Sequence, residues 1–228
     1  MFRRWRYKKR CAALVGQCSQ PALKTYLDGC SGLDVGDVAN TPMISVDLEL
    51  TGLDANSNKI ISIGWTLIDG GRVHMGSNRH VLTNADQSVG ASATIHELMD
   101  NEIADGVELD TGLKRLFKAA VGRVWIFHHA GLDVAFLQQA CRAWAGVVPP
   151  FAVLDTMQIE LALRKRRNYP IGQGDLQLSQ LRRDYNLPRY TAHNALIDAF
   201  ATAELLLAIA ARLDRKAPLK LSPYLRFI

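Results

Sequence analysis

The sequence predicts an α/β domain in which a mixed sheet lies between layers of helices. Two observations support this prediction. Residues 44–82 contain three segments with strand character, separated by turns. After them, helical segments alternate with short apolar runs. Three antiparallel strands followed by alternating helices and strands indicate a sheet with both strand directions, flanked by helices.

The antiparallel part of the sheet is predicted from three neighbouring segments. Ile44–Leu50 is an apolar run with alternating character, and Lys59–Ile68 (KIISIGWTLI) is rich in β-branched residues. Residues 69–71 (DGG) are typical of a hairpin turn, so Arg72–Leu82 should return alongside the second strand.

The second half of the chain alternates between helical periodicity and short strands. Arg123–Phe127 and Val153–Thr156 have the length of buried strands, which gives a five-stranded sheet in total. Helices are expected at Ile95–Ile103, Thr111–Ala120, Gly131–Trp144, from Thr156 to about Arg164, Leu176–Tyr185 and Asn194–Leu213.

Composition is that of a globular protein with a basic surface. The 228 residues are 48% hydrophobic and carry a formal net charge of +5, which favours a polyanionic partner. None of the four cysteines forms a pair with metal-site spacing, so we expect reduced thiols and a cytoplasmic protein. No apolar run reaches the ~18 residues that cross a membrane, so no membrane contact is expected.

The chain is expected to divide into three parts. Residues 1–42 are a basic N-terminal extension, residues 43–213 are the main domain, and residues 214–228 are a Pro-punctuated tail. The first ten residues (MFRRWRYKKR) hold six of the 27 Lys and Arg and no acid. The extension is either a packing arm or solvated tail, or a contact for nucleic acid or a partner protein.

Two acids stand out in the first strand. Asp47 and Glu49 are two residues apart, so on a strand they project from the same face. Side by side on a buried strand they are costly unless a cation lies between them, and hard divalent cations prefer carboxylate oxygens. The alternative is a solvated edge strand with two surface acids.

Further acids occur where later helices begin. Asp133 falls in the first turn of a helix that follows a strand, where the helix dipole favours a carboxylate. His193 and Asp198 are five residues apart and cannot share a helical face. We therefore expect His193 on a loop, Asn194 near the N-cap and Asp198 in the first turns, facing a common site.

Together these motifs resemble the DEDD superfamily of 3′–5′ exonucleases, in its DnaQ-like branch with a histidine in the last motif. The family pattern Asp-x-Glu-x-Thr-Gly is matched by Asp47–Gly52 (DLELTG). The pattern His-Asn-x-x-Phe-Asp is matched by His128–Asp133 (HHAGLD), with His129 in place of Asn and Leu132 in place of Phe. The third motif is His193 followed by Asp198 in an Ala-rich helix, and the match covers about residues 43–210.

The resemblance implies a ribonuclease H-like fold for residues 43–213 and a two-metal phosphodiesterase with Mg²⁺, which Mn²⁺ would replace. It implies that Asp47 bridges both ions, that Glu49 and Asp198 hold the site of the nucleophilic water, and that Asp133 helps to hold the second ion. His193 would take the proton from the water. Substrate contacts are expected from residues of the first and second motifs: Leu50, Thr51, Gly52, Leu53 and His129.

The expected activity is removal of nucleoside 5′-monophosphates from the 3′ end of single-stranded DNA, in proofreading or repair. A polymerase or another protein could contact the extension or the tail. An RNA-trimming or oligoribonucleotide exoribonuclease shares the same acids, and a non-catalytic nucleic-acid-binding module is a further alternative. Leu53 either meets the terminal base or packs internally. Six cations, Arg164–Arg167, Arg182 and Arg183, either contact phosphates or are solvated.

Overall fold

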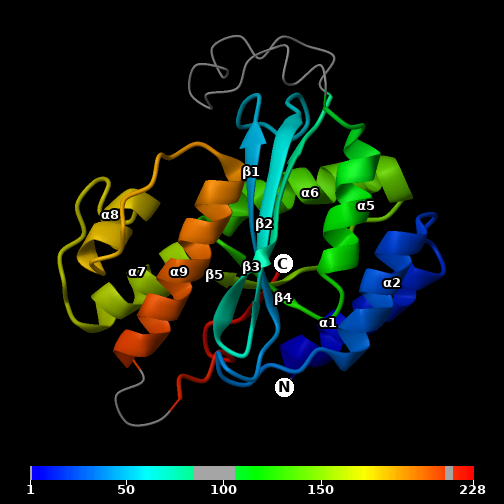
Figure 1. The fold of residues 1–228 in the computed structure, drawn as a ribbon. Helices are drawn as coiled ribbons and strands as arrows, with labels where there is room; N and C mark the ends of the chain where they lie inside the picture. The colour runs from blue at the N-terminus through cyan, green and yellow to red at the C-terminus, as the bar shows by residue number, and fades with distance from the viewer. Residues whose placement is uncertain (1, 85–105, 214–217) are drawn as a thin grey trace.

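The computed structural model describes residues 2–84, 106–213 and 218–228, and it contains a six-stranded sheet with helices on both sides (Figure 1). The strands are β1 (Met43–Leu50), β2 (Ile60–Asp69), β3 (Arg72–Leu82), β4 (Val124–Phe127), β5 (Ala152–Asp155) and β6 (Arg226–Phe227). The helices are α1 (Phe2–Val15), α2 (Pro21–Gly29), the 3₁₀ turn η1 (Cys30–Gly32), α5 (Leu109–Ala119), α6 (Ala130–Ala145), α7 (Thr156–Arg166), α8 (Leu178–Asp184) and α9 (Ala195–Leu213).

The sheet order is β3-β2-β1-β4-β5-β6, which confirms the predicted mixed α/β architecture. The strands β1, β2 and β3 form an antiparallel meander, and β4 and β5 run parallel to β1. The sixth strand is an addition to the five expected. It arises because the tail returns beside β5, where Phe151 and Ile228 exchange two backbone hydrogen bonds. The helix expected at Ile95–Ile103 lies outside the described residues.

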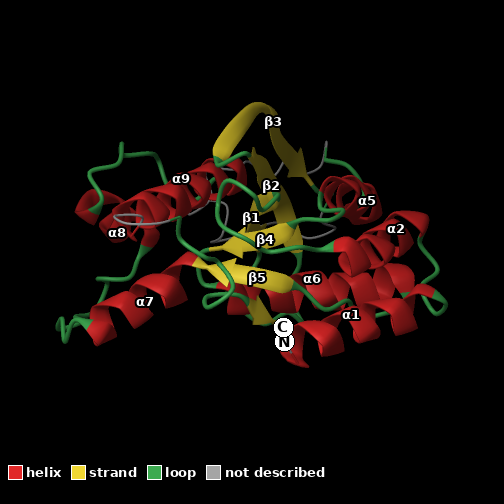
Figure 2. Ribbon diagram, turned by 90° about the horizontal axis from the view of Figure 1, so that it is seen from below, coloured by secondary structure: helices red, strands yellow, loops and turns green. Residues whose placement is uncertain are grey.

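Helices cover the sheet in two layers, as the view from below shows (Figure 2). The helices α7, α8 and α9 lie on one side, and α1, α2, α5 and α6 lie on the other. Helix α9 packs directly against β1 and β2, and its small side chains Ala195, Ala199 and Ala203 are buried. Small residues allow a helix to approach a sheet closely, so α9 is well suited to place a side chain over β1.

An aromatic cluster fills the other side of the sheet. Tyr26, Phe117, Trp125 and Phe151 are fully or almost fully buried, with ring centroids 4.9–6.3 Å apart. The Tyr26 hydroxyl accepts a hydrogen bond from Trp125 Nε1 at 3.1 Å and donates one to the Pro150 carbonyl at 3.2 Å. A residue of the N-terminal extension thus belongs to the main core.

The inner side of the extension packs on the domain, as expected for a packing arm. Tyr7, Cys11, Leu23 and Leu27 are all buried. Helix α2 is not among the helices expected from the sequence, and it begins at Pro21. Pro21 occupies the first turn of α2, where a missing N–H leaves no hydrogen bond unmade. All four cysteines are free thiols in buried positions.

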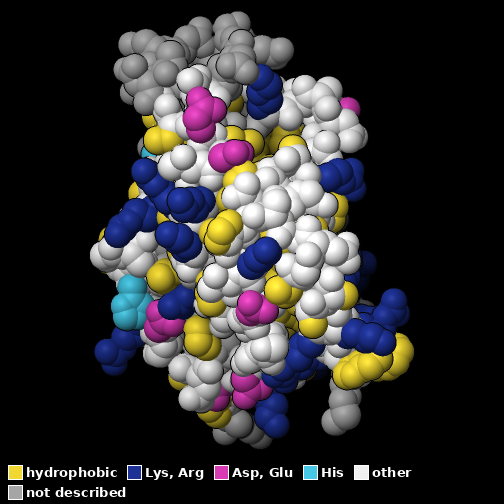
Figure 3. All heavy atoms as spheres, turned by 90° about the vertical axis from the view of Figure 1, so that its right-hand side faces the viewer, with side chains coloured by type: hydrophobic (Ala, Val, Ile, Leu, Met, Phe, Trp, Pro, Cys, Tyr) yellow, Lys and Arg dark blue, Asp and Glu magenta, His cyan; other side chains and the backbone are white. Residues whose placement is uncertain are grey.

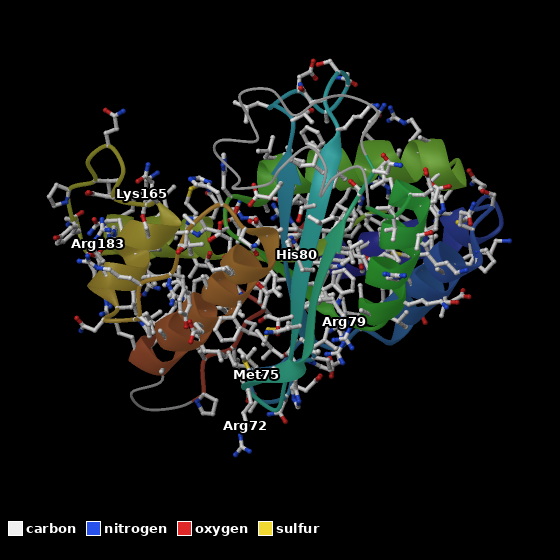
Figure 4. The ribbon with its side chains drawn as sticks, turned by 45° about the horizontal axis from the view of Figure 1, so that its top comes forward. Arg72, Met75, Arg79, His80, Lys165 and Arg183 are labelled. Carbon is white, nitrogen blue, oxygen red and sulfur yellow. The ribbon has the colours of Figure 1, made fainter. Side chains whose placement is uncertain are left out.

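Among the described strands, β3 forms one edge of the sheet, and Arg72 and Arg79 lie along it. Figure 4 shows Arg72, Met75, Arg79 and His80 following this strand. Charged side chains on an edge strand disfavour pairing with another sheet. Within the described residues, no helix has both the length and the apolar character needed to cross a membrane.

Candidate active site

The pair of acids lies on an interior strand. Strand β1 is bonded to β2 on one side and β4 on the other, which rules out a solvated edge strand. Asp47 is half-buried and Glu49 is buried. One carboxylate oxygen from each of Asp47, Glu49 and Asp198 lies within 4.8 Å of the other two. The structure therefore brings the first and third sequence motifs together.

Asp198 reaches this position through the start of α9. The Asn194 side chain accepts hydrogen bonds from the backbone N–H of Leu196 at 3.1 Å and of Ile197 at 3.2 Å, so Asn194 is the N-cap that the sequence predicts. His193 precedes it on the loop with a left-handed φ of 67°. Its backbone N–H donates a hydrogen bond to Asp198 Oδ2 at 2.8 Å, which ties the histidine loop to the acidic cluster.

A glycine that sequence reasoning missed allows this close approach. Gly64 on β2 lies directly opposite Asp47. A Cβ atom at Gly64 would lie 2.1 Å from the carbonyl carbon of Ala195, in the first turn of α9. Because that neighbour is backbone, the helix itself would have to move. A glycine inside a strand pattern signals a close backbone approach, and this signal was present in the sequence.

Asp133 lies in the first turn of α6, as predicted, and is buried. The backbone of Leu48 on β1 acts to lower the pKa of Asp133, and the charge of Asp133 acts on Asp47. Asp133 is not part of the group within 4.8 Å that the other three acids form. It therefore lies beside the cluster rather than inside it.

Asp155, which is not among the predicted site residues, fixes the start of α6. The buried Asp155 carboxylate accepts hydrogen bonds from the backbone N–H groups of His129 and Ala130 at 3.2 and 3.0 Å. It also caps α7 through Met157 N and Gln158 N at 3.0 and 3.2 Å. One side chain thus joins the N-termini of two helices, and the left-handed φ of 70° at His129 turns the chain into α6.

The electrostatics of the cluster favour a bound cation. Burial raises the pKa of Asp47 well above its usual range, and the charges of the other three acids raise it further. Burial, with repulsion from Asp198 and Asp133, raises the pKa of Glu49 to about 8. Burial raises the pKa of Asp133 to about 7 and also raises that of Asp198. Four carboxyl groups that resist ionisation in one place fit hard divalent cations, which would stabilise the charged forms.

The substrate residues expected from the first motif form the end of β1 and the following turn. Leu50 is buried, and the Thr51 hydroxyl accepts a hydrogen bond from the backbone N–H of Lys59 at 2.9 Å. A Cβ atom at Gly52 would lie 2.4 Å from the Asn58 side-chain oxygen. Leu53 is 81% exposed, so it does not pack internally. The turn presents an apolar side chain to solvent beside the acids.

A cavity of about 680 Å³ opens next to the acids. His129, His193 and Asp198 line its near end, and α8 and the loop that follows it line the far end with Arg183 and Arg189. His128 also lines the cavity, and two hydrogen bonds hold its ring in place. Its ring nitrogens are hydrogen-bonded to Thr156 Oγ1 at 2.8 Å and to the Leu176 carbonyl at 2.9 Å, and burial lowers its pKa.

The predicted phosphate-binding cations fall into two groups. Arg164 and Arg182 are buried, and they pair with acids of neighbouring helices, Asp184 at 2.5 Å and Glu204 at 2.8 Å. These two arginines hold α7, α8 and α9 together, and Arg182 also lines the cavity. The other four, Lys165, Arg166, Arg167 and Arg183, are exposed. Figure 4 labels Lys165 and Arg183 on the α7–α8 side.

Known proteins share both this fold and this sequence pattern. The chain is 26% identical over 173 residues to the 3′-5′ exonuclease DinG of Staphylococcus haemolyticus, a match that covers 75% of this chain but only 18% of DinG. It is also 26% identical over 177 residues to DNA polymerase III subunit epsilon of Salmonella typhimurium, with 75% and 72% of the two chains covered.

Solved structures share the fold at low sequence identity. E. coli Exonuclease I in complex with a dA16 oligonucleotide superposes with a TM-score of 0.65 and 14% identity, over 77% of this chain and 42% of that one. Cell-death related nuclease 4 (CRN-4) superposes with a TM-score of 0.62 and 10% identity, over 76% and 65%.

A family model described as Exonuclease (RNase_T) matches residues 44–206. That range holds the three clustered acids, Asp133 and the loop histidine, in the order in which the three motifs occur. The resemblance to the DEDD 3′–5′ exonucleases is thereby confirmed. Since the match extends over well more than half of the sequence, the chain belongs to the exonuclease family.

Proposed function

We propose that the chain is a 3′–5′ exonuclease that acts on single-stranded DNA and releases nucleoside 5′-monophosphates. The observation that supports this most is the cluster of Asp47, Glu49 and Asp198 within 4.8 Å, with Asp133 and the His193 loop beside it. DNA is favoured because the structural neighbour Exonuclease I holds a dA16 oligonucleotide. A role in proofreading or repair follows from the relative named as polymerase subunit epsilon.

The acids are proposed to hold two Mg²⁺ ions, which Mn²⁺ would replace. Asp47, Glu49 and Asp198 would be the principal ligands, and Asp133 would complete the set. Bound divalent ions would supply a nucleophilic water at neutral pH and stabilise the charge that develops on the phosphate. The raised pKa values of the unliganded acids support this, because a carboxylate is easier to ionise beside a cation.

His193 is proposed to take the proton from the attacking water. Histidine is the commonest general base because imidazole exchanges protons near neutral pH. The hydrogen bond from its backbone N–H to Asp198 keeps the loop next to the acids, and its side chain lines the cavity. The exposed position of His193 leaves it room to turn toward a bound substrate.

The substrate strand is proposed to enter between the first motif and the cavity. Leu53 would contact the terminal base, and the backbone of Leu50–Gly52 together with His129 would position the last nucleotide. Upstream phosphates would pass the far end of the cavity, where Arg183 and Arg189 lie. A polymerase or another protein partner would contact the exposed parts of residues 1–42 or the C-terminal tail.

The test is digestion of 5′-labelled single-stranded DNA with Mg²⁺. We expect a ladder of shortened, still labelled products, which Asp47→Ala abolishes and the exposed-acid control Asp28→Ala leaves unchanged. Early release of a labelled mononucleotide would reverse the proposed polarity. Faster laddering of an RNA of the same sequence would make the chain an exoribonuclease. Absence of both cleavage and calorimetric Mg²⁺ binding would indicate a non-catalytic module.

A further inference from the structure

Helix α1 has two faces of different chemistry. Tyr7 and Cys11 are buried on the inner face, against the rest of the domain. Phe2, Trp5 and Lys9 follow one another at helical spacing on the outer face. Phe2 is 69% and Trp5 56% exposed, although large aromatic side chains are normally buried. The inner face accounts for the packing of α1, and it leaves the outer face unexplained.

On the outer face, aromatic rings and cations alternate. The rings of Phe2 and Trp5 are stacked, with centroids 6.2 Å apart. The Arg6 guanidinium lies 5.9 Å from the Phe2 centroid, and the Lys9 ammonium lies 5.1 Å from the Trp5 centroid. These residues with Arg10 and Ala13 line a shallow hollow of about 390 Å³. Figure 3 shows the surface patch, hydrophobic side chains beside Lys and Arg at the lower edge of the molecule.

The charge of this face is not fully paired within the part of the chain that the structure describes. Arg4 donates a hydrogen bond to the Asp34 carboxylate, and Lys8 donates one to the Ser31 carbonyl. These bonds attach α1 to the turn η1 and the residues after it. Among the described residues, no ion pair involves Arg3, Arg6 or Lys9. The first turn of α1 has no acid, although acids are the residues that the positive end of a helix favours. The local sequence therefore gathers positive charge at some cost to helix stability.

We propose that the outer face of α1, formed by Phe2, Trp5, Arg6 and Lys9 with Arg3 and Arg10, is a second binding surface for single-stranded nucleic acid. Exposed rings offer stacking platforms for bases, and flanking Arg and Lys neutralise phosphates. A lipid surface fits less well. A helix lying on a membrane needs a continuous apolar face, and the apolar face of α1 is already buried in the protein.

This surface would act apart from the acidic cluster. A strand long enough to reach both surfaces is held at two places, which raises its effective concentration at the site. A strand that is too short gains nothing from α1. The surface is thus expected to strengthen binding of long strands without changing the hydrolytic step.

Trp5 provides a direct reporter for this surface. The other tryptophans, Trp65, Trp125 and Trp144, are at most 9% exposed. We expect oligo-dT to quench or shift the fluorescence of Trp5 in the full chain in the presence of EDTA, where a metal-dependent nuclease does not cleave. The change should disappear in Trp5→Phe. Because the measurement needs no cleavage, its result is independent of the proposed exonuclease activity.

Charge reversal tests whether Arg6 and Lys9 contribute to binding of the nucleic acid. In the double variant Arg6→Glu, Lys9→Glu we expect affinity for oligo-dT to fall at least about tenfold, with a salt slope smaller by about 1.4, since each phosphate contact to a single strand contributes about 0.7. The matched control is Lys114→Glu, Lys118→Glu, two exposed lysines on α5. Thermal unfolding of both variants verifies the fold.

Three outcomes would overturn the proposal. Oligo-dT could bind without altering Trp5 fluorescence, or both double variants could weaken binding equally. The third is a Trp5 response to anionic phosphatidylserine vesicles and none to oligo-dT at equal phosphate concentration, which would assign the surface to a membrane.

Discussion

The two faces of β1 differ in what they contribute. One face carries Ile44, Val46 and Leu48, which are 0–6% exposed within the main hydrophobic cluster. The other face carries Asp47 and Glu49 under α9, where charge is disfavoured by burial and by neighbouring acids. A strand held firmly by its apolar face can maintain an unfavourable set of carboxylates on the other. Removing an acid from the one face should therefore lower activity and stabilise the metal-free protein. A substitution in the apolar core on the other side should lower stability and leave activity unchanged.

The largest effect is expected at Asp47. Asp47→Asn keeps the shape of the side chain and removes one charge from the cluster. We expect nuclease activity to fall by at least about 10³-fold, because a proposed ligand of both ions is lost. In EDTA the same variant should unfold at a higher temperature than the wild type, because repulsion with the other acids is relieved. Thermal unfolding and product laddering measure the two effects.

The pH dependence of the stability of the metal-free protein tests whether charging the buried acids destabilises the fold. The pKa of Glu49 is raised to about 8 and that of Asp133 to about 7, above their usual values of 4.5 and 3.8. Between the usual and raised values the folded protein holds protons that the unfolded chain has released. Its free energy of unfolding therefore decreases as pH rises from about 4 to about 8. A flat profile over this range, or a lower melting temperature for Asp47→Asn, would contradict the explanation.

The next largest effect is expected at Gly64, a positioning residue that touches α9 and not the substrate. Gly64→Ala places a methyl group against the backbone of Ala195 and shifts Asp198 away from Asp47. A displacement of about 1 Å can lower catalysis about 10²-fold. We expect kcat to fall and calorimetric affinity for Mg²⁺ to weaken. Gly76→Ala on β3 is the control, since a Cβ there meets nothing within 4 Å. Unaltered Mg²⁺ affinity in Gly64→Ala would exclude this role.

On the opposite side of the sheet, Tyr26→Phe should affect stability alone. The variant keeps the ring and removes the hydroxyl, so Trp125 Nε1 loses its acceptor in a fully buried position. Leaving a buried donor unpaired costs about 1–3 kcal/mol. Denaturant unfolding should show this loss while kcat stays unchanged. The exposed Tyr169→Phe is the control, and a reduced kcat in Tyr26→Phe would show that the two faces are coupled.

Much of the fold and the acids could be predicted because their signals are local. The periodicity of residues 44–82 gives the three strands within a residue or so of their observed bounds. The capping role of Asn194 follows from its place between the loop histidine and an Ala-rich helix. Each of these features depends on neighbours in the sequence.

The features that were missed depend on distant contacts. Strand β6 has two residues and forms only because β5 offers a free edge. The sequence marks Gly64 only as a glycine within a strand and Asp155 only as an acid at a strand end. Their partners appear only when α9 approaches β2 and when two helix starts meet at one carboxylate. Helix α2 was missed for a different reason, because a proline such as Pro21 can either end a helix or begin one.

The smallest effect is expected at Leu53, which belongs to neither face. Since its side chain is 81% exposed, Leu53→Ala should change the free energy of unfolding by less than about 0.5 kcal/mol. If Leu53 contacts the terminal base, the same variant should raise KM a few-fold for single-stranded DNA and lower the preference for frayed over paired 3′ ends. The matched control is Met75→Ala on β3, which also truncates an exposed apolar side chain. A loss of stability without any change in KM would show that Leu53 supports the turn after β1 and does not meet the substrate.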